Sequence, residues 1–523
     1  MGLGKRIIFH SKTILPRRNY SKLSKNSPQW KSVVGLEVHA QIQSETKLFS
    51  GSPTKFSSPV NSNAALFDIS TPGTLPVLNK RCVEAGVLTA LSLNCKVNPV
   101  SYFDRKHYFY ADMPSGYQIT QQRAPLASNG NMEFHVFAPG VHKTCYKTSA
   151  RIKQLQLEQD SGKSLHDFDK SLVDLNRAGI PLMELVFEPD LVDGEEAAAL
   201  IKELMMILQT IQTCSCKMEE GALRIDANVS IHKDGEPLGT RTEIKNIGSV
   251  RGVAGAIKYE IQRQIKIKEN NGTIVNETRS WNPEKKITVP MRDKEVQQDY
   301  RYMPEPNLPP LHIGMGPVEN GFINADKIRE KIPELPEQIR CRLRETFGLT
   351  SEQSIILVND FHLLRAFEES ISGRSISGTK LANFLINELN RALNQMDLEL
   401  QNVKCNLKYF GEILELIEAS TISRATALLV TEELLKGNMD NPTKIVADKN
   451  WKQITDEKEL RKICQQILDE NEKAVKDYLK GKTKVFNAFM GYVAKKTDNR
   501  ADMKKCSEIV KELLLHLENK RQP

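Results

Sequence analysis

Hydrophobic and polar residues alternate along short segments of the chain up to about residue 320, and Gly, Pro, Asn and Asp interrupt these segments. The clearest early example is residues 33–42, where Glu37, His39 and Gln41 share one side and apolar residues occupy the other. Period-two alternation predicts a strand that buries one face. The first part of the chain is therefore expected to be rich in half-buried strands.

A second alternating segment, residues 222–231, places Asp226 on its polar side. The Asp-Gly pair that follows is a hairpin signal, and residues 240–246 are expected to form the return strand with Glu243 on its polar side. Asp226 and Glu243 can then be cross-strand neighbours, although the sequence does not fix the register of the pair.

Apolar residues at helical spacing occur twice within the strand-rich part and dominate the chain from about residue 324 onward. The proline-rich stretch 283–317 is expected to be irregular. The fold class is predicted to be α+β, with a mixed-sheet domain followed by an all-α helical domain and a small helical tail domain. The expected helices cover residues 194–212, 250–267, 336–347, 355–371, 379–395, 409–418, 423–435, 460–472, 485–496 and 502–517.

These changes of pattern divide the chain into four parts. A length of 523 residues has room for about three domains of ~150 residues each. The predicted parts are a leader over residues 1–30, a sheet domain over 31–323, a helical domain over 324–450 and a helical tail over 451–523.

Positive charge is concentrated at the N-terminus. The formal net charge is +8, from 73 Lys and Arg against 65 Asp and Glu. Residues 1–36 hold eight basic residues and no acidic residue, so subtracting eight from 73 leaves 65 basic residues against 65 acidic ones in the rest. A basic, Ser-containing segment that lacks acids and a continuous apolar core is typical of a mitochondrial transit peptide. A disordered arm that binds nucleic acid is the alternative.

Composition excludes two other classes of protein. The mean hydropathy is −0.41, and no apolar run approaches the ~18 residues of a membrane span. The nine cysteines are scattered and odd in number, which argues against a disulfide framework. Cys214 and Cys216 form one C-x-C without a second pair at zinc spacing, so reduced structural thiols are expected.

Carboxylates recur on the predicted strands. Besides Glu37, Asp226 and Glu243, Glu158 and Glu184 lie in short strand-like runs among apolar neighbours. Burying a carboxylate is costly unless something cationic neutralises it. Each acid taken singly is more often the partner of a nearby Lys or Arg than a metal ligand, but five acids on separate strands are harder to explain in that way. The set therefore points to a divalent cation or a phosphoryl substrate.

Magnesium is the first candidate ion, because Mg²⁺ prefers oxygen ligands and bridges carboxylates to substrate phosphates. His39 suits Mn²⁺, or a hydrogen-bonding role, better than it suits Mg²⁺. Arg105, Lys106, Arg224 and Lys245 are the cations expected to meet a phosphate. Because the sequence contains no standard phosphate-binding loop, ATP would have to bind without one.

Seven segments carry a resemblance to a known family: residues 34–39, 103–119, 157–163, 174–184, 220–228, 243–246 and 299–306. In this order they resemble the B subunit of the glutamyl-tRNA(Gln) amidotransferases, in particular the mitochondrial form. The helical remainder resembles the same family more loosely. At Gln159 the chain departs from the family, which has a second acid after the position of Glu158.

The resemblance implies a cradle-shaped sheet domain and a heterotrimer with an amidase-type A subunit, which releases ammonia from glutamine, and a small C subunit. It implies that ATP phosphorylates the side-chain carboxylate of glutamate on Glu-tRNA(Gln) and that ammonia then attacks the acyl phosphate, in the mitochondrial matrix. The helical tail would hold the tRNA.

Particular residues are expected to have particular roles. Catalytic roles are predicted for Glu37, His39 and Lys245, and cofactor binding is predicted for Arg105, Lys106, Arg224 and Lys245. The metal-site positions of the family fall on Glu37, His39, Glu158, Glu184, Asp226 and Glu243.

Two other functions remain open from the sequence. One is a tRNA-binding scaffold whose metal site has decayed, in which Glu37→Ala or Asp226→Ala would leave amidation unchanged. The other is a stand-alone metal-dependent hydrolase, which would cleave a phosphoester without partners. The Lys-rich stretch 473–505 is expected either to contact tRNA or to form solvated helix faces.

Overall fold

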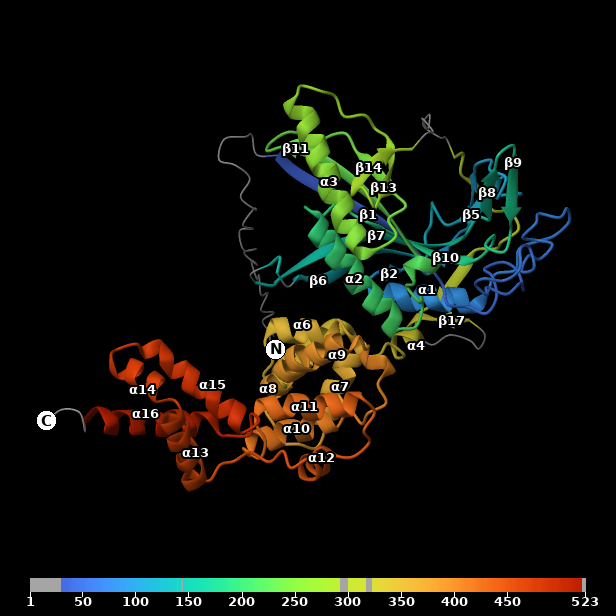
Figure 1. Ribbon diagram of the computed structural model, residues 1–523. Helices are drawn as coiled ribbons and strands as arrows, with labels where there is room; N and C mark the ends of the chain where they lie inside the picture. Colours follow the sequence, from blue (N-terminus) through green and yellow to red (C-terminus); the bar gives the residue numbers. More distant parts are fainter. Residues whose placement is uncertain (1–29, 139, 143, 292–299, 317–321, 520–523) are drawn as a thin grey trace, which may run out of the picture.

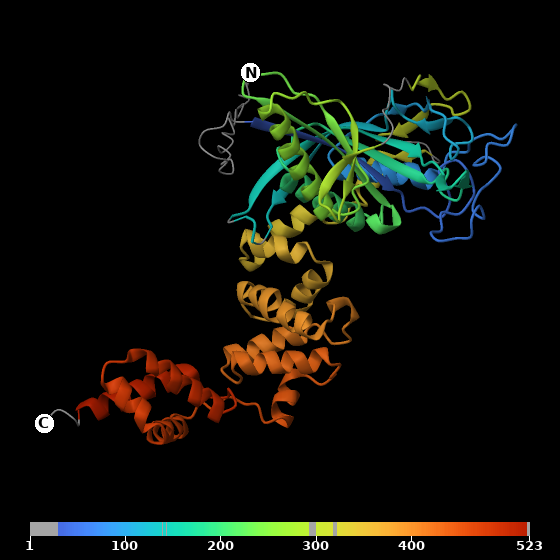
Figure 2. The same ribbon diagram turned by 45° about the horizontal axis from the view of Figure 1, so that its top comes forward.

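The computed structural model describes residues 30–138, 140–142, 144–291, 300–316 and 322–519 (Figure 1). The predicted leader, apart from its last residue, lies outside the described residues. The sheet region leads through a stack of helices to a tail that projects to one side (Figures 1 and 2).

A nine-stranded sheet forms the centre of the first region. Its strands pair antiparallel, except that β12 and β13 run parallel. Because β1 lies in the middle of the sheet, both of its edges are paired. In spatial order the strands are β14 (Ile287–Pro290), β13 (Thr278–Asn282), β12 (Thr242–Lys245), β11 (Leu223–Lys233), β1 (Trp30–Gln41), β10 (Pro181–Phe187), β7 (Tyr146–Gln159), β6 (Ala127–Val136) and β2 (Lys96–Val97).

The residues of β1 show why the sheet has an apolar face and a polar face. Val34, Leu36 and Val38 are fully buried, whereas Glu37 and His39 are only partly buried. Successive side chains of a strand point to opposite faces, so alternation in the sequence becomes a division between the two faces. Each fully buried Val or Leu stabilises the fold by about 1.5–3 kcal/mol relative to an exposed one.

Three helices cover the apolar face and share one hydrophobic core with β1. They are α1 (Lys80–Ser92), α2 (Gly194–Thr210) and α3 (Val250–Glu269), and α3 packs against β11. The opposite, polar face is thereby left to polar side chains and to the smaller sheets.

Local sequence sets the start of α2 and its contact with α3. Asp193 caps the helix, because its carboxylate accepts a hydrogen bond from the backbone N–H of Glu196 at 2.8 Å. Gly194 allows α3 to come close, since a Cβ at this position would lie 2.3 Å from the carbonyl oxygen of Ala254.

Smaller strand groups accompany the large sheet. The first consists of β15 (Met303–Pro304), β4 (Asp104–His107) and β5 (Tyr117–Thr120), and β5 packs beside β7. The others are the sheet β17 (Ile323–Asn324), β16 (Leu311–Gly314) and β3 (Val100–Ser101), and the hairpin β8 (Lys163–Asp167) and β9 (Lys170–Asp174).

The helical part contains two further hydrophobic cores, one in the stack and one in the tail. The stack and its approach comprise α4 (Ala325–Arg329), α5 (Pro336–Phe347), α6 (Ser351–Val358), α7 (Phe361–Ile371), α8 (Gly378–Asn383), the π-helical Phe384–Leu389, α9 (Asn390–Met396), α10 (Tyr409–Glu418), α11 (Arg424–Leu435) and α12 (Pro442–Asp448). The tail comprises α13 (Glu457–Glu470), α14 (Glu472–Leu479), α15 (Phe486–Lys496) and α16 (Met503–Asn519). Short 3₁₀ turns cover Met218–Glu220, Leu400–Asn402 and Thr483–Val485.

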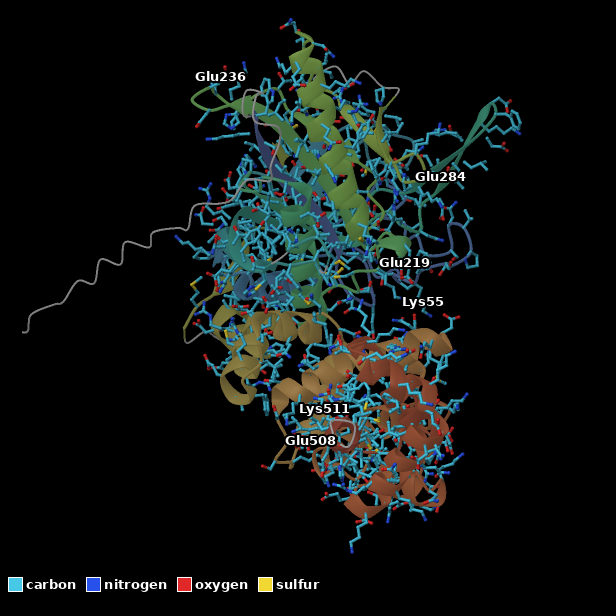
Figure 3. The ribbon with its side chains drawn as sticks, turned by 60° about the vertical axis from the view of Figure 1, so that its left-hand side comes forward. Lys55, Glu219, Glu236, Glu284, Glu508 and Lys511 are labelled. Atoms are coloured by element: carbon cyan, nitrogen blue, oxygen red, sulfur yellow. The ribbon has the colours of Figure 1, made fainter. Side chains whose placement is uncertain are left out.

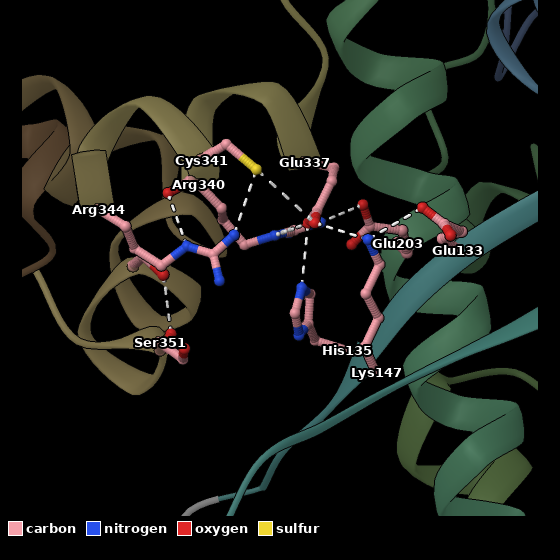
Figure 4. A network of polar contacts seen from close by, with 10 residues as sticks. Glu133, His135, Lys147, Glu203, Glu337, Arg340, Cys341, Arg344 and Ser351 are labelled. Carbon is pink, nitrogen blue, oxygen red and sulfur yellow. Dashed lines mark hydrogen bonds and ion pairs between the residues drawn. The ribbon is translucent and has the colours of Figure 1, made fainter. Parts of the chain in front are cut away.

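A polar network joins the sheet region to the helical stack (Figure 4). The Glu337 carboxylate accepts hydrogen bonds from His135 Nε2 and Lys147 Nζ, both at 3.0 Å, and from Arg340 Nε at 2.9 Å. The buried Arg340 also donates from Nη2 to Glu203 Oε1 at 2.6 Å. These five residues are called the joint network. Burial raises the pKa of Glu337, but the three donors outweigh it and hold this pKa below its usual range.

The structure corrects several predictions. α1 was not expected, and the expected helix over 355–371 is divided at Asp360, which caps α7 by accepting a hydrogen bond from Leu363 N. The expected helix over 379–395 contains the π-helical segment. The stretch 283–317, expected to be irregular, contributes β14, β15 and β16 within its described residues. Pairing orders these short segments, which have no periodicity of their own: β14 pairs with the preceding β13, whereas β15 and β16 pair with the distant strands β4 and β3.

Candidate metal and phosphoryl site

The polar face of the sheet brings together acids that are far apart in the sequence. Glu37 of β1 lies directly opposite Asp226 of β11. Two residues further along β1, His39 lies opposite Glu184 of β10 on one side and Arg224 of β11 on the other. Directly opposed residues of an antiparallel pair point to the same face, so these side chains share one surface.

His39, Glu158 and Glu184 form the compact centre of this surface. The Nε2 atom of His39 lies 3.4 Å from Glu158 Oε1 and 3.6 Å from Glu184 Oε1. One possible ligand atom from each residue lies within 4.8 Å of the other two. Thr120 donates a hydrogen bond to Glu158 at 3.2 Å, and Gln156 donates one to Glu184. The three residues His39, Glu158 and Glu184 are called the acid cluster.

The electrostatics of the acid cluster are unfavourable without a cation. Burial raises the pKa of both Glu158 and Glu184, and the negative charge of Glu158 raises that of Glu184 further. The pKa of His39 is lowered to about 3, by burial first and then by the positive charges of Arg224 and Lys106. At neutral pH His39 is therefore an uncharged imidazole beside two crowded carboxyl groups.

This donor set fits a divalent cation. An uncharged imidazole nitrogen and carboxylate oxygens are ligands that Mn²⁺ accepts readily, and carboxylates are the protein ligands that Mg²⁺ prefers. A positive charge between His39, Glu158 and Glu184 would offset the repulsion that raises the carboxyl pKa values. The structure therefore brings three of the predicted metal ligands together.

The other three predicted ligands extend the site along β1, β11 and β12. Glu37 accepts a hydrogen bond from Asn228 Nδ2 at 3.1 Å. Glu243 lies directly opposite Asn228, so Asp226 and Glu243 are diagonal neighbours on the shared polar face of β11 and β12. Lys245 links the two acids, with Nζ 3.4 Å from Glu243 Oε1 and 3.7 Å from Asp226 Oδ2.

Asp226 is the acid of this second group whose ionisation is most perturbed. Burial raises the pKa of Asp226 to about 6; Lys245 opposes that increase, and the charges of Glu243 and Glu37 add to it. The side chain therefore sits among competing charges, as expected where a cationic ligand is to be bound.

Lys106 is the predicted cation that meets the acid cluster. It extends from β4, and its Nζ lies 4.6 Å from the centre of the Tyr300 ring. Burial alone would lower its pKa, but the charges of Glu158 and Glu184 raise it above the usual value. Lys106 therefore carries its charge over the polar face of the sheet.

Arg105 does not join the acids. Its Nε and Nη2 atoms donate hydrogen bonds to Glu305 at 2.6 Å and 3.0 Å, and its guanidinium lies 4.2 Å from the centre of the Tyr117 ring. Neighbouring residues of a strand point to opposite sides, which separates Arg105 from Lys106. Phosphate binding by Arg105 stays a prediction.

Arg224 reaches a residue that the sequence did not single out. Its Nη2 lies 3.0 Å from Asp160 Oδ2, and its buried Nε has no hydrogen-bond partner among the described residues. Asp160 was expected only as part of a turn. Gln156 and Asn228 were also missed, although each lies two residues from an identified acid on the same strand, which is the signal that could have found them.

A cavity of about 680 Å³ adjoins the site at the end of β1. Gln41, which shares the polar side of β1 with His39, lines this cavity together with Phe56, Asn79, Arg81 and Glu220. The acids themselves are not part of its wall. A cavity of this volume can hold a small molecule. A ligand could therefore be bound beside the acids as well as directly on the polar face of the sheet.

The fold and the site define a protein in which a mixed sheet carries a largely buried acid cluster next to cationic side chains. The family model described as the GatB/GatE catalytic domain matches residues 32–319, and the one described as the GatB domain matches residues 365–514.

Curated relatives match almost the whole chain. The B subunit of the mitochondrial glutamyl-tRNA(Gln) amidotransferase of Aedes aegypti is 53% identical over 510 residues, which cover 95% of this chain and 97% of the relative. The human mitochondrial B subunit is 46% identical over 507 residues, covering 95% and 91%. The B subunit of the aspartyl/glutamyl-tRNA(Asn/Gln) amidotransferase of Rickettsia typhi is 42% identical over 491 residues, covering 94% and 98%. The chain belongs to this family of amidotransferase B subunits, and the resemblance inferred from the sequence is confirmed.

Proposed function

We propose that this chain activates the side-chain carboxylate of glutamate on Glu-tRNA(Gln) with ATP and completes its conversion to Gln-tRNA(Gln) in mitochondria. The carboxylate oxygen would attack the terminal phosphorus of ATP and release ADP. Ammonia would then attack the carbonyl carbon of the acyl phosphate and release phosphate. The chain would act as an ATP-dependent carbon–nitrogen ligase in the mitochondrial matrix, with the amidase-type A subunit supplying ammonia from glutamine and the small C subunit making up the heterotrimer.

The acid cluster is the observation that carries this proposal. Two carboxylates whose pKa values are raised lie beside an uncharged imidazole and within reach of the charge of Lys106. Surface ion pairs do not require this arrangement, but phosphoryl transfer does, because it depends on positioning and on neutralising negative charge. The names of the relatives support the same reaction.

Each predicted site residue has a proposed role. Glu37, Glu158, Glu184, Asp226 and Glu243 would, with His39, hold Mg²⁺ or Mn²⁺, which when bound would neutralise charge on the terminal phosphates. Lys106, Arg224 and Lys245 would orient the phosphoryl group, and Arg105 would do so only if it left Glu305. Glu37, His39 and Lys245 are the proposed catalytic residues, since they lie on the polar face where the substrate carboxylate must arrive.

The domain division and the tRNA-binding tail are part of the proposal. Three hydrophobic cores, whose buried residues lie between 34 and 328, 343 and 446, and 460 and 514, support boundaries near residues 324 and 451. The tail carries many of its lysines on exposed positions, among them Lys473, Lys482, Lys484 and Lys505. Such a surface suits the phosphate backbone of tRNA.

The decisive test is the conversion of Glu-tRNA(Gln) by the complex that carries Glu37→Ala or Asp226→Ala. We expect loss of the ATP-dependent step, while the glutaminase activity of the amidase is retained. Unchanged conversion would contradict the catalytic role and would favour the tRNA-binding scaffold.

The tail is tested separately. Reversing Lys473, Lys482, Lys484 and Lys505 to Glu should weaken tRNA binding and reduce its dependence on salt concentration, because fewer counterions are released. The same charge reversal at Lys55, on the sheet region, serves as the control (Figure 3). A salt dependence equal to that of the wild type would show that these lysines are only solvated.

A further inference from the structure

Arg224 places one paired and one unpaired donor on the polar face of the sheet. Its Nη2 atom lies 3.0 Å from Asp160 Oδ2, whereas its buried Nε has no hydrogen-bond partner among the described residues. A guanidinium is planar and holds its N–H groups in a fixed fork, so an ion pair at Nη2 also limits the direction of the Nε–H bond. A buried donor without an acceptor is costly, which indicates that an acceptor arrives with a ligand.

The ion pair between Arg224 and Asp160 bridges the strands that carry the centre of the site. Arg224 is on β11, and Asp160 directly follows β7. β1 and β10 lie between these two strands in the sheet (Figure 1). On β1, His39 lies directly opposite Arg224. The guanidinium of Arg224 is therefore beside the acid cluster, where the proposed function places the transferring phosphoryl group.

Backbone hydrogen bonds fix the position of Asp160. Its N–H donates to the Ile180 carbonyl at 2.8 Å, and its carbonyl accepts a hydrogen bond from Gly179 N at 2.9 Å. Its side-chain Oδ1 accepts a hydrogen bond from Ser161 N at 2.9 Å, while Oδ2 faces Arg224. Asp160 is only 7% exposed. Both the backbone and the carboxylate of Asp160 are thus held in place by the chain around them.

A second arginine holds the turn that begins at Asp160. Arg177 Nε donates to the Ser161 carbonyl at 2.9 Å, and Arg177 Nη2 donates to the Gly162 carbonyl. The same Nε lies 3.6 Å from Asp160 Oδ2, which is beyond the usual length of a hydrogen bond. Arg177 therefore clamps the backbone of the turn, and Arg224 is the arginine that the Asp160 carboxylate holds at short distance.

We propose that Asp160 is a positioning residue for phosphoryl transfer, which holds the guanidinium of Arg224 so that its Nε–H meets an oxygen of the transferring phosphoryl group. This inference rests on the proposed function and adds a residue to its site. A donor that is oriented before the reaction costs no reorganisation when charge develops on the phosphoryl oxygens. Asp160 acts on the reaction through Arg224.

The test is the ATP-dependent conversion of Glu-tRNA(Gln) by the assembled complex, with ammonium chloride as the nitrogen source. Asp160→Asn keeps an acceptor for Ser161 N but removes the charge that holds Arg224. We expect kcat to fall about 10–10²-fold, the range for misplacing a reacting group, while KM for ATP and for Glu-tRNA(Gln) changes less than about twofold. Asp190→Asn is the matched control and should behave like the wild type, because Asp190 pairs at 2.7 Å with Arg151, an exposed residue outside the site.

A double-mutant cycle shows whether Asp160 acts through Arg224. Arg224→Lys keeps the positive charge but loses the fork, and we expect kcat to fall about 10²-fold or more. Adding Asp160→Asn to Arg224→Lys should lower kcat less than about threefold further, because the group that Asp160 positions is already gone. If the two losses multiplied, Asp160 would act independently of Arg224, as part of the turn that Arg177 clamps, and the inference would be overturned.

Thermal unfolding and tRNA binding show whether each variant is folded. If Asp160→Asn does not fold, Asp160→Glu replaces it in the same cycle, because it keeps the charge but displaces it from Arg224. A higher KM for ATP or for Glu-tRNA(Gln) at an unchanged kcat would overturn the inference, since Arg224 would then hold a substrate in its ground state. If Arg224→Lys is fully active and Glu37→Ala is inactive, only this inference fails. If both variants are fully active, the proposed function fails as well.

Discussion

Among the buried and partly buried carboxylates of this chain, those of two regions have opposite surroundings. In the joint network, Glu337 accepts hydrogen bonds from three donors, and its pKa is lowered. In the acid cluster, Glu158 and Glu184 crowd against each other beside an uncharged His39, and both carboxyl pKa values are raised. The first arrangement stabilises the ionised acid, and the second one destabilises it.

The comparison separates structure from function. A carboxylate that is fully supplied with donors holds two regions together. A carboxylate whose burial outweighs the effect of nearby positive charges, as in the acid cluster beside Lys106, weakens the fold, so its presence calls for a ligand that is bound during function. Removing the negative charge of a carboxylate should therefore lower the free energy of unfolding in the joint network, and should leave it unchanged or raise it in the acid cluster.

The largest effect is expected from breaking the joint network at Arg340. Arg340→Met leaves the Glu203 and Glu337 carboxylates without their shared donor, and we expect a loss of about 3–5 kcal/mol in the free energy of unfolding. Urea unfolding measures this loss. Arg342→Met on the same helix is the control, because Arg342 pairs with Glu334 and Glu368 on the surface and should contribute less than about 1 kcal/mol. Equal losses in the free energy of unfolding of both variants would show that the joint network contributes no more stability than a surface ion pair.

The next effect concerns the acid cluster. Glu184→Gln should lower kcat for amidation about 10²–10³-fold, which is the range for removing one preorganised electrostatic contact. The free energy of unfolding should stay the same or rise, because a repelling charge is removed. Glu188→Gln, just beyond β10, should change neither quantity. A large loss of stability with little loss of activity would make the acid cluster structural and remove the contrast with Glu337.

Divalent cations should stabilise the protein through the acid cluster and not through the joint network. Titrating Mn²⁺ or Mg²⁺ into the wild-type chain at pH 7 should raise the midpoint of thermal unfolding, with a stabilisation of about 2.7 kcal/mol at a hundredfold excess over Kd. The Glu184→Gln variant should respond much less, because it has lost a proposed ligand. Arg340→Met, though less stable, should show the same cation-dependent increase as the wild type. An equal response of all three proteins would place cation binding elsewhere.

The smallest effect is the dependence of stability on pH, measured in EDTA. The folded pKa of Asp226, about 6, lies above its ordinary value of 3.8, so stability should increase as the pH falls from about 6 to 4, when the folded state takes up the proton. The folded pKa of Glu337 is lowered instead, so its contribution is present above the unfolded value of about 4.3 and is lost at lower pH.

These opposite slopes predict a stability maximum between the two ranges, with changes of about 1–2 kcal/mol on either side. Asp226→Asn should flatten the dependence of stability on pH between pH 6 and 4. Glu337→Gln should flatten this dependence below that pH range. Identical pH profiles for the wild type and both variants would show that neither carboxylate is perturbed in the way described.

Sequence patterns predicted most of the local structure. The helices over Pro336–Phe347 and Tyr409–Glu418 begin and end as predicted, and β1 and β11 follow the alternation that identifies them. Helices that depend on tertiary packing were harder to predict. α1 lacks a strong periodic signal in the sequence, yet eight of its residues are buried against the sheet.

The sequence by itself determined which acids lie on the polar sides of their strands, because alternation assigns Glu37, Asp226 and Glu243 to those sides, and its ordered segments place the chain in its family. It did not determine which of these acids meet. Strand order and register decided that: β10 and β7 beside β1 bring Glu184 and Glu158 to His39, while β12 places Asn228, not Asp226, opposite Glu243.

The physical reason is that side-chain alternation is a local property of a strand, whereas register depends on turns, bulges and the packing of helices across the whole sheet. The same reason applies to Arg105, which shares its strand with Lys106 but is turned toward Glu305 by a small sheet that only the folded chain assembles.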